Sequence, residues 1–256
     1  MEFRNVTVVK EGKTLLDSIS VTISEGENIA ILGPNGAGKS SLIKAITREY
    51  YPISQDDHVV FRIWGREIWH VFDLRPMLGV VSNDLQYTFM RELSGEEVVL
   101  SGFFSSIGLF NREITCKMRE KTDEILEFLE ISHLRNRTMR SMSSGEARRF
   151  LIGRALVHDP KALLLDEPSN SLDLHALHTF RNTLRTIAQS GTAILMVTHN
   201  IHDIIPEISR VILMKEGRFW KDGRKAEILT DENIGRLFEA PVHIREENGW
   251  YYATGY

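Results

Sequence analysis

The sequence predicts an α/β fold built on a doubly wound, mostly parallel sheet. Three compact apolar runs carry this prediction: NIAIL before Gly33, ALLL before Asp166 and AILMV before Thr198. Each run is too short and too uniformly apolar for a surface helix, which is typical of a strand that is buried on both faces. Between the last two runs, residues 174–189 place apolar side chains at helical spacing. The order there is therefore strand, helix, strand.

The N-terminal part of the chain has a different pattern. The stretches FRNVTVVKEG and TLLDSISVTISEGE alternate apolar and polar residues on either side of a turn signal. Alternation with a period of two is typical of strands that bury one face. We therefore expect an antiparallel sheet ahead of the parallel core.

Helical spacing replaces the strand patterns from about residue 84 to about residue 150. The run ITCKMREKTDEILEFLEI is helical, whereas GFFSSIGLF is apolar without a period. The interval 84–150 is therefore predicted to be an inserted helical subdomain. At about 240–256, a turn signal at Asn248 and Gly249 predicts a short hairpin-like appendage. Together these parts are expected to form a single domain, residues 1–256.

Composition narrows the class of protein. The chain has 256 residues, 42% of them apolar, which is enough for a sizeable core in a globular protein. A net charge of −4 offers no global field for nucleic acid, so no direct nucleic-acid binding is expected. Five arginines form a cluster broken by acidic and apolar residues, which we interpret as a solvated or phosphate-facing patch. They are Arg135, Arg137, Arg140, Arg148 and Arg149.

Cysteine content and hydropathy indicate the compartment. With one cysteine, Cys116, the chain cannot form an internal disulfide, which fits a reducing compartment. The N-terminal stretch MEFRNVTVVKEG lacks the apolar core of a signal peptide, and no apolar run approaches the roughly 18 to 20 residues that span a bilayer. We therefore expect a cytoplasmic protein whose role at a membrane would depend on a partner.

The most specific motif follows the first apolar run. GPNGAGKSS matches G-x-x-x-x-G-K-[ST], a loop whose glycines allow successive backbone amides to wrap phosphate oxygens. Lys39 supplies charge to the outer phosphates, and Ser40 offers a hydroxyl to Mg²⁺. Because the loop follows a strand and precedes the helix-like run LIKAI, it predicts binding of a nucleoside triphosphate. Its residues are Gly33, Pro34, Asn35, Gly36, Ala37, Gly38, Lys39, Ser40 and Ser41.

Polar side chains also end the other two apolar runs. Asp166 follows ALLL and suits Mg²⁺, directly or indirectly, while Glu167 is free to orient or deprotonate a water molecule. His199 comes after AILMV and Thr198, and we expect it to hydrogen-bond the terminal phosphate. Open α/β sheets bind ligands at the carboxyl ends of their strands. These side chains are therefore expected at the phosphate site.

Two stretches with S-x-x-E spacing predict helix starts. In MSSGE, Ser143 and Glu146 can each satisfy an amide at the start of a helix, as a capping box does. Ser94 and Glu97 repeat the spacing in ELSGEEVVL. Only MSSGE lies shortly before the LLLDEP strand. For ELSGEEVVL we therefore expect capping alone.

Taken in order, these motifs resemble those of the nucleotide-binding subunits of ATP-binding cassette (ABC) systems. GPNGAGKSS resembles the Walker A loop, MSSGE the signature LSGGQ, LLLDEP the Walker B strand, SLD the D-loop, and His199 the switch histidine. The resemblance covers nearly the whole chain. It implies a P-loop NTPase core, ATP and Mg²⁺ as cofactors, and ATP hydrolysis that depends on Glu167. The implied D-loop residues are Ser171, Leu172 and Asp173.

The resemblance also implies a second subunit. In this family two cassettes pack head to tail, and the signature of one closes over the triphosphate held by the other. We therefore expect a homodimer in which the signature acts on the partner's nucleotide through helix-start amides, a serine hydroxyl and a glycine. The signature residues are Ser143, Ser144, Gly145 and Glu146.

The signature departs from the family pattern at two positions. Ser144 replaces a glycine, and Glu146 replaces a glutamine. A carboxylate aimed at phosphate would repel it. As a member of a capping box, however, Glu146 would point back to its own helix.

Two further departures concern the nucleotide. Where the family carries a glutamine that contacts Mg²⁺ and the attacking water, LGVVSNDLQ offers either Asn83 or Gln86. Where the family stacks an aromatic ring on adenine, the chain has only Val9 and Lys10. We therefore expect loose selectivity for the base.

The motifs favour an ATPase subunit that energises a membrane transporter from the cytoplasmic face, with separate transmembrane subunits docked on the helical subdomain. GFFSSIGLF is either part of that docking surface or part of the core of the subdomain. The closing pattern EILTDENIGRLFEAPVHI resembles cassettes of metal-chelate importers. The alternative is a soluble ABC ATPase of a non-membrane machine, in iron-sulfur assembly, repair or ribosome work. A catalytically silent assembly module is a third class, against which Glu167 argues.

Overall fold

The computed structural model describes residues 1–53 and 59–255, which form two compact units. The first unit comprises Met1–Leu74 and Ala193–Tyr256, and the second comprises Arg75–Thr192. The first unit therefore contains both ends of the chain, and the second is inserted into it in sequence. Tyr256, the last residue of the expected appendage, lies outside the described residues.

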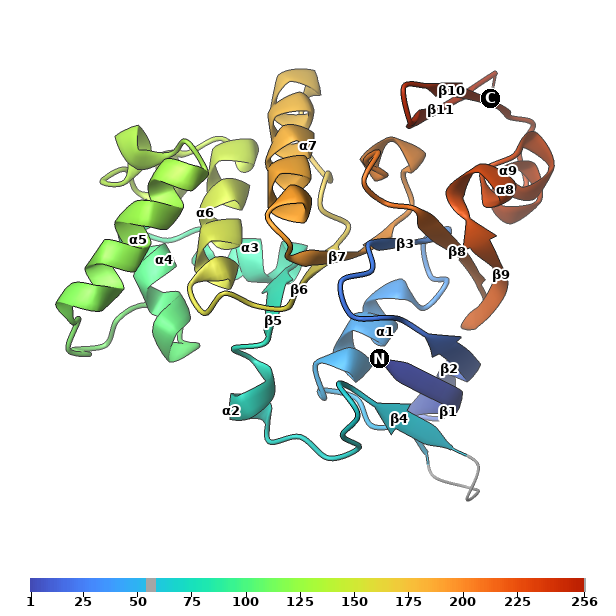
Figure 1. The fold of residues 1–256 in the computed structure, drawn as a ribbon, viewed down its shortest axis with the longest axis horizontal. Coiled ribbons are helices and arrows are strands. Elements are labelled where there is room, and N and C mark those ends of the chain that lie inside the picture. The colour runs from blue at the N-terminus through green and yellow to red at the C-terminus, as the bar shows by residue number, and fades with distance from the viewer. Residues whose placement is uncertain (54–58, 256) are drawn as a thin grey trace. The chain divides into compact units, whose positions relative to one another are not determined.

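The first unit contains most of the strands (Figure 1). Its N-terminal elements are β1 (Glu2–Lys10), β2 (Lys13–Thr22), β3 (Ile29–Leu32), α1 (Lys39–Ile46), β4 (Val60–Arg62) and α2 (Val71–Leu74). Its C-terminal elements are β7 (Ala193–Thr198), a 3₁₀ turn (Ile201–Asp203), β8 (Arg210–Lys215), β9 (Arg218–Arg224), α8 (Lys225–Ile228), α9 (Asp231–Phe238), β10 (His243–Glu247) and β11 (Trp250–Thr254).

Strand β3 has a parallel partner on each side. Leu32 lies opposite Thr198 of β7 and opposite Leu213 of β8. All side chains of β3 and β7 are buried, as expected for strands covered on both faces. The strands predicted from NIAIL and AILMV are therefore confirmed. Strand β9 runs antiparallel to β8 and ends this part of the sheet.

A separate antiparallel sheet contains the N-terminus, with the strand order β2-β1-β4. At the reversal between β1 and β2, Glu11 and Gly12 have φ angles of 51° and 76°. Such left-handed pairs match the twist of a two-residue hairpin. The two predicted strands are confirmed. Strand β4 was not predicted, because three residues are too few to show an alternating pattern.

The C-terminal hairpin consists of β10 and β11, which pair antiparallel. Its turn has Asn248 and Gly249 at φ angles of 53° and 81°, so the predicted turn is confirmed. The buried Lys225 Nζ donates hydrogen bonds to Gly249 O at 3.0 Å and to Ile205 O at 3.2 Å. This ammonium group ties the hairpin to the chain that follows β7.

The second unit is mainly helical. Strands β5 (Leu78–Val81) and β6 (Ala162–Asp166) pair in parallel. The helices are α3 (Asn83–Phe89), α4 (Gly95–Ser101), α5 (Cys116–Phe128), α6 (Ser144–Leu156) and α7 (Leu174–Gln189), with 3₁₀ turns at Gly102–Phe104, Ser132–Leu134 and Met139–Ser141. No strand occurs between residues 84 and 150, all of which the structure describes.

Helix α6 is the centre of the helical part, with α4 and α5 beside it in Figure 1. A Cβ atom at Gly153 would lie 3.1 Å from Val99 Cγ2 and 3.2 Å from Ile125 Cγ2. A larger residue at Gly153 would therefore push these helices apart.

The predicted fold class is confirmed. The chain has an α/β fold with mostly parallel strands and an N-terminal antiparallel sheet. The helix predicted at residues 174–189 is α7, whose buried positions include Phe180, Leu184 and Ile187. Within the described ranges, no helix combines the length and the apolar character needed to cross a bilayer.

Candidate functional site

The loop of residues 33–41 connects β3 to α1 in the first unit. Gly36 and Gly38 have φ angles of 80° and 104°, which side chains rarely adopt. At Gly33 the constraint is space, because a Cβ atom there would lie 2.2 Å from Met214 O. Helix α1 starts without a side-chain cap from Gly38. The loop and the helix start thus have the geometry of an anion-binding nest.

Lys39 lies within this loop. Its side chain is 4% exposed, and Nζ donates hydrogen bonds to Gly33 O at 2.9 Å and to Pro34 O at 2.8 Å. A buried ammonium group requires such acceptors. These two carbonyl groups keep the Lys39 ammonium beside the loop backbone that would surround a phosphate.

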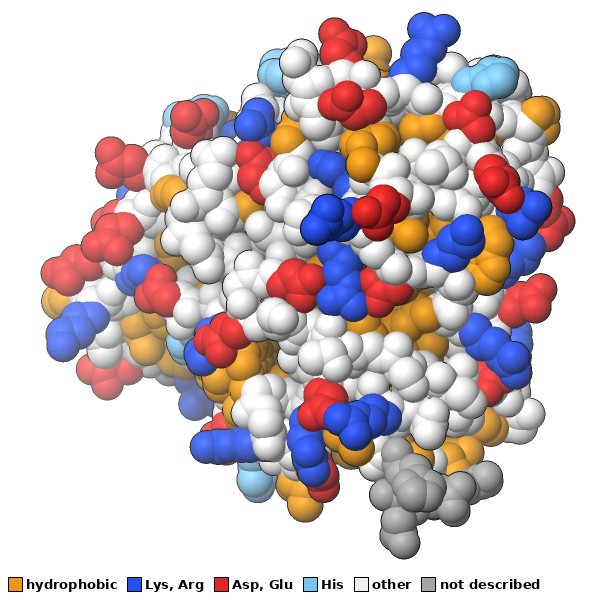
Figure 2. All heavy atoms as spheres, turned by 45° about the vertical axis from the view of Figure 1, so that its right-hand side comes forward, with side chains coloured by type: hydrophobic (Ala, Val, Ile, Leu, Met, Phe, Trp, Pro, Cys, Tyr) orange, Lys and Arg blue, Asp and Glu red, His pale blue; other side chains and the backbone are white. Residues whose placement is uncertain are grey.

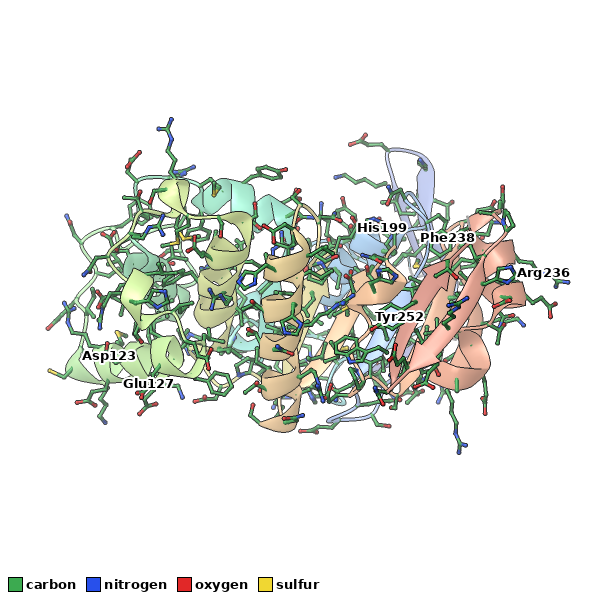
Figure 3. The ribbon with its side chains drawn as sticks, turned by 90° about the horizontal axis from the view of Figure 1, so that it is seen from above. Asp123, Glu127, His199, Arg236, Phe238 and Tyr252 are labelled. Atoms are coloured by element: carbon green, nitrogen blue, oxygen red, sulfur yellow. The ribbon has the colours of Figure 1, made fainter. Side chains whose placement is uncertain are left out.

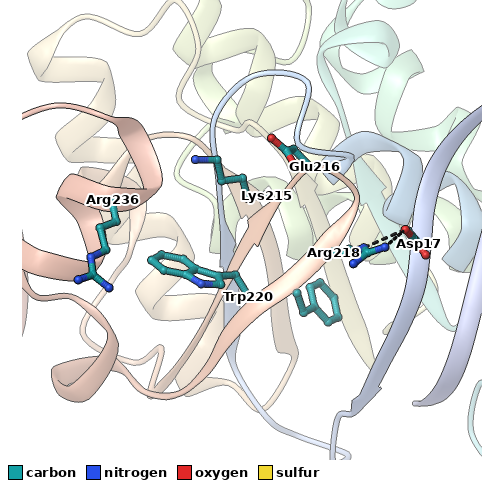
Figure 4. A pocket seen from close by; sticks show the side chains of 7 residues that line it. Asp17, Lys215, Glu216, Arg218, Trp220 and Arg236 are labelled. Atoms are coloured by element: carbon teal, nitrogen blue, oxygen red, sulfur yellow. Dashed lines mark hydrogen bonds and ion pairs between the residues drawn. The ribbon is translucent and has the colours of Figure 1, made fainter.

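The turn between β8 and β9 supports the loop of residues 33–41, called the phosphate loop below, through backbone hydrogen bonds. Gly217 N donates to Ala37 O at 2.9 Å, and Asp17 N donates to Gly217 O at 2.9 Å. Arg218 pairs with Asp17 at 2.5 Å, as Figure 4 shows, and its hydrogen bond lowers the pKa of the Asp17 carboxyl. The sequence analysis missed this support, since the turn lies about 180 residues from the loop.

His199 begins where β7 ends, in the same unit as the phosphate loop. Because Leu32 and Thr198 are register partners, the chain leaves β3 and β7 at the same edge of the sheet. There Gly33 N donates to Thr198 O at 3.1 Å. The structure therefore places His199 next to the start of the phosphate loop.

The segment after β7 also packs against the C-terminal part of the first unit. His199 and His202 line a cavity of about 510 Å³ with apolar side chains that include Phe238. The rings of His202 and Tyr252 meet edge to face, 5.6 Å apart. Figure 3 labels His199, Phe238 and Tyr252 on the three segments that meet here. The histidine segment is thus in contact with the appendage.

In the second unit, β6 ends at Asp166 and a tight turn begins at Glu167. The φ angle of Glu167 is 47°, a left-handed conformation that is uncommon outside glycine. Such a conformation costs about 1–3 kcal/mol and is often found at functional sites. Asn170 Nδ2 donates to Glu167 Oε2 at 2.8 Å. Both the backbone and Asn170 therefore determine where the Glu167 carboxylate points.

Arg148 of α6 lies beside this turn. Arg148 is 2% exposed, and its guanidinium donates to Gln86 Oε1 and to Asn83 Oδ1, both on α3. The interpretation of Arg148 as part of a solvated or phosphate-facing patch is therefore wrong. The position lies on the inner face of α6, where buried acceptors satisfy the charge. Arg135, by contrast, remains partly exposed and pairs with Glu96 at 2.7 Å.

The predicted capping box at the start of α6 is confirmed. Ser143 Oγ accepts from Glu146 N at 3.2 Å, and Glu146 Oε2 accepts from Ser143 N at 2.7 Å. Burial raises the pKa of Glu146, but the hydrogen bonds from Ser143 and the charge of Arg137 outweigh this and lower it. The ionised carboxylate thus points back to its own helix. Ser94 and Glu97 form an equally complete box on α4.

The signature and the D-loop lie next to each other in the second unit. A Cβ atom at Gly145 would lie 2.8 Å from Ala176 Cβ, at the start of α7. Asp173 caps this helix, since its Oδ1 accepts from Ala176 N at 2.8 Å. Ser171 has a φ of 66°, and Leu172 N donates to Ser169 O at 3.1 Å. Gly145 therefore has a packing role besides any contact with phosphate.

The expected site residues are divided between the two units. The first unit holds residues 33–41 and His199, and the second holds the others. Arg148 and Asn170 were missed by the sequence analysis. Asn170 could have been found from its place three residues after Glu167, a spacing that a turn brings together. No local signal distinguishes Arg148 from Arg149.

Comparison with known proteins identifies the family. Residues 16–170, more than half of the chain, match the family described as ABC transporter. The chain belongs to the ABC transporter family. The cassette is 34% identical to an uncharacterized ABC transporter ATP-binding protein, YlmA of Bacillus subtilis (strain 168), over 95% of the cassette and 92% of YlmA. It is 30% identical to the hemin import ATP-binding protein HmuV of Bradyrhizobium diazoefficiens, over 93% and 88% of the two chains.

Solved structures support the same conclusion. A nucleotide-free ATP-binding cassette from an ABC transporter is 25% identical, with a TM-score of 0.76 over 94% of the cassette and 95% of that chain. A dimeric bacterial ABC transporter cassette, MJ0796, is 25% identical, with a TM-score of 0.70 over 87% and 97%. The cassette is thus an ABC ATPase, which binds ATP and couples its hydrolysis to transport. ABC cassettes dimerise and associate with transmembrane subunits in transporter complexes.

Proposed function

We propose that two copies of this cassette close around ATP and energise a membrane importer of the metal-chelate class. The likeness to a hemin import ATP-binding protein supports the direction and class of transport. The cassette would act as one domain, residues 1–256, in which 84–150 form the helical subdomain and 240–256 the appendage. It would lie on the cytoplasmic face of the membrane, bound to separate transmembrane subunits.

The residues of the phosphate loop would bind the triphosphate. Successive amides of residues 33–41 would wrap its oxygens, and the Lys39 ammonium would move from loop carbonyls to the outer phosphates. His199, which lies next to the loop, would donate a hydrogen bond to the terminal phosphate. Glu167 would orient the attacking water and accept its proton.

Ser40 and Asp166 would supply oxygen ligands to Mg²⁺. A hydroxyl and a carboxylate are the hard donors that Mg²⁺ takes alongside phosphates and water. Ser40 is exposed on the first turn of α1, and Asp166 is partly exposed at the end of β6. These donors fit the ion. Mg²⁺ would neutralise charge that develops on the phosphates.

The signature would act on the nucleotide held by a second copy. Ser143 is exposed at the start of α6, and Ser144 is partly exposed beside it. Because the Glu146 carboxylate points toward Ser143 N, it would not oppose a phosphate approaching the helix start. Ser171, Leu172 and Asp173 adjoin the signature and would follow its movement.

The observation that carries docking on a membrane subunit is an exposed apolar surface on the second unit. Tyr87 and Phe110 are 78% and 75% exposed, and Met90 and Ile107 are partly so. We call these four residues the apolar docking surface. Exposed apolar patches of this kind mark sites of protein association. Within GFFSSIGLF, Phe103 packs on the ring of His158, whereas Phe110 is exposed and available to a partner.

Arg154 connects the two segments of the apolar docking surface. Its Nη2 donates to Ser106 O at 3.3 Å, and its guanidinium lies 5.0 Å from the ring of Phe89. A Cβ atom at Gly108 would lie 3.8 Å from Leu93 Cδ2. The segment from α3 to Leu93 and the segment around Gly108 are therefore adjacent. Helix α3 also carries the amides bonded to Arg148, which in turn bonds to the turn that begins at Glu167, called the catalytic turn below. A partner bound here would therefore be linked to the catalytic turn through α3 and Arg148.

Phe110→Asp tests the docking proposal. A charge in the centre of an apolar interface should reduce co-purification with the membrane subunits by at least about tenfold. The measurement is recovery of the cassette from solubilised membranes after co-expression with the products of neighbouring genes. Basal ATPase activity of the isolated cassette should stay near wild type. Ile68→Asp is the matched control, because Ile68 is also a highly exposed apolar residue, at 89%, but lies on the first unit.

Two outcomes would contradict docking at this surface. Equal recovery of the wild type and Phe110→Asp would mean that the partner binds elsewhere. Recovery of the wild type only from the soluble fraction, with a non-membrane complex, would favour the alternative of a soluble machine. Nucleic acid is not among the proposed partners, since acidic and basic side chains are interspersed on the face in Figure 2.

Base selectivity gives a second test. Lys10 lies near the place where the family carries an aromatic residue, and its Nζ lies 4.9 Å from the ring centroid of Tyr50, which follows α1. Without a stacking ring at Val9 or Lys10, most binding energy must come from the triphosphate, so GTP should displace ATP at comparable concentrations. A competition assay with labelled ATP measures this. Strong preference for ATP that disappears in Tyr50→Ala would show that Tyr50 contacts the base and that selectivity is not loose.

A further inference from the structure

Arg148 is a buried arginine that bonds to two other segments of the second unit. It lies in the first turns of α6 and is 2% exposed. A buried guanidinium is stable only when its donors are hydrogen-bonded. The acceptors come from two other segments of the second unit, α3 and the turn that follows β6. One side chain therefore connects three segments that are far apart in sequence.

On α3, Arg148 binds both candidates for the family's missing glutamine. Its Nε and Nη2 donate to Gln86 Oε1 at 3.0 Å and 2.6 Å, and Nη2 also donates to Asn83 Oδ1 at 2.7 Å. The two amide oxygens are thus directed at the guanidinium. Both candidates therefore share one partner, the Arg148 guanidinium.

On the catalytic turn, Arg148 binds the backbone. Its Nη1 donates to Glu167 O at 3.3 Å and to Pro168 O through a short hydrogen bond. Glu167 has a left-handed φ of 47°, a conformation that costs free energy in a residue other than glycine and that contacts around the turn can stabilise. Asn170 bonds to Glu167 twice, since its Nδ2 donates to the carboxylate and its backbone N donates to Glu167 O at 3.4 Å. The guanidinium adds side-chain hydrogen bonds from α6 to Glu167 O and Pro168 O, so it also restrains the peptide that carries the carboxylate.

We propose that Arg148 is a positioning residue for ATP hydrolysis. It holds the Glu167 backbone in its left-handed conformation and holds the Asn83 and Gln86 amides at a fixed distance from that turn. Any movement of α3 is thereby transmitted to Glu167. The inference rests on the proposed role of Glu167 in orienting water, and it adds a residue that neither the motifs nor the family resemblance designates.

Only arginine can make this connection. The planar fork presents donors in fixed directions, so that one face binds two side-chain oxygens while another binds two carbonyls. A lysine has one nitrogen and cannot reach acceptors on both sides of the group. Lysine at position 148 should therefore preserve the charge without preserving the geometry.

The test compares Arg148→Ala and Arg148→Lys with Arg154→Ala in the full-length protein. Arg154 is the matched control, because it is an equally long, largely buried cation on the same helix. Its guanidinium donates to Ser101 Oγ and Ser106 O and lies over the ring of Phe89 at the end of α3, so it touches α3 without bonding to Asn83, Gln86 or Glu167. ATP affinity, kcat, KM and the melting temperature are measured for each variant. Glu167→Gln is assayed in parallel.

The expected result is a split between binding and turnover. In both Arg148 variants kcat should fall about 100-fold, because a small displacement of a catalytic group has that effect. ATP affinity should change less than about threefold, since the phosphate loop belongs to the other unit. Arg154→Ala should lower the melting temperature but keep the kcat of the folded protein. Added guanidinium ion, at a concentration too low to denature the protein, should raise the kcat of Arg148→Ala about tenfold.

Rescue of Arg148→Ala by guanidinium would exclude the explanation that the substitution only destabilises the fold. Guanidinium should not activate Arg154→Ala or the wild type, and sodium chloride at equal ionic strength should rescue nothing. If Arg148→Lys or Arg148→Ala keeps the kcat of Arg154→Ala, the positioning role is wrong. A variant that does not fold is replaced by Asn83→Ala combined with Gln86→Ala, which removes the hydrogen bonds between Arg148 and α3 and should lower kcat with intact ATP affinity. If Glu167→Gln keeps the wild-type kcat, the proposed role of Glu167 is wrong, and this result does not depend on the Arg148 variants.

Discussion

Glu167→Gln is expected to reduce ATP turnover by about 100-fold or more while ATP binding is retained. The substitution keeps the size of the side chain and its left-handed backbone, but removes the carboxylate that would accept a proton from water. The phosphate loop and Lys39 are unchanged. Phosphate release measures turnover, and titration with a fluorescent ATP analogue measures binding.

Lys39→Ala supplies the contrast for this experiment. Its loss removes the ammonium that is held at Gly33 O and Pro34 O, and it should weaken ATP binding as well as turnover. Turnover by Glu167→Gln near the wild-type rate would show that another group activates water. If both variants lost binding equally, the assignment of separate roles to Glu167 and Lys39 would have to be abandoned.

Ser143→Arg is expected to abolish ATP-driven dimerisation and to spare nucleotide binding by the monomer. Ser143 is exposed at the start of α6, so an arginine there can be accommodated in one copy but not where two copies should meet around ATP. Glu167→Gln provides the background, because it should halt hydrolysis after closure. Size-exclusion chromatography with and without ATP compares the single and double variants.

The second capping box is the control for this experiment. Ser94 makes the same hydrogen bonds at the start of α4 that Ser143 makes at the start of α6. Replacing either serine should cost about 0.5–2 kcal/mol of stability through loss of the cap. Ser94→Arg in the Glu167→Gln background should still dimerise with ATP. Dimerisation of Ser143→Arg in that background would leave capping as the only role of MSSGE.

Much of the phosphate loop could be predicted because its geometry is local. Gly36 and Gly38 adopt left-handed φ angles that the motif requires, and the strand before Gly33 is identified by its apolar run. The capping box of Ser143 and Glu146 is local for the same reason, since all four atoms of its hydrogen bonds lie within one helix turn. Hydrogen bonds and backbone angles within a few residues depend little on the rest of the chain.

The support of that loop could not be predicted. Gly217 bonds to Ala37 only because β8 lies parallel to β3 and β9 turns back on β8. A short turn between two strands gives no sign of what its amide will contact. The same limit applies to Tyr50, whose place beside Lys10 depends on how the segment after α1 returns to β1.

By itself the sequence determined the family and the strands and helices that carry each motif, and it predicted the roles proposed for Lys39, Asp166 and Glu167. Only the tertiary structure decided what separates Arg148 from Arg149. The two adjacent residues have the same charge and the same helix propensity. One of them faces α3 and the catalytic turn because of the way α6 packs, 62 residues from Gln86 and 19 from Glu167 in the chain. Burial is a property of the covering segments, and a guanidinium acquires its role from the acceptors that those segments bring to it.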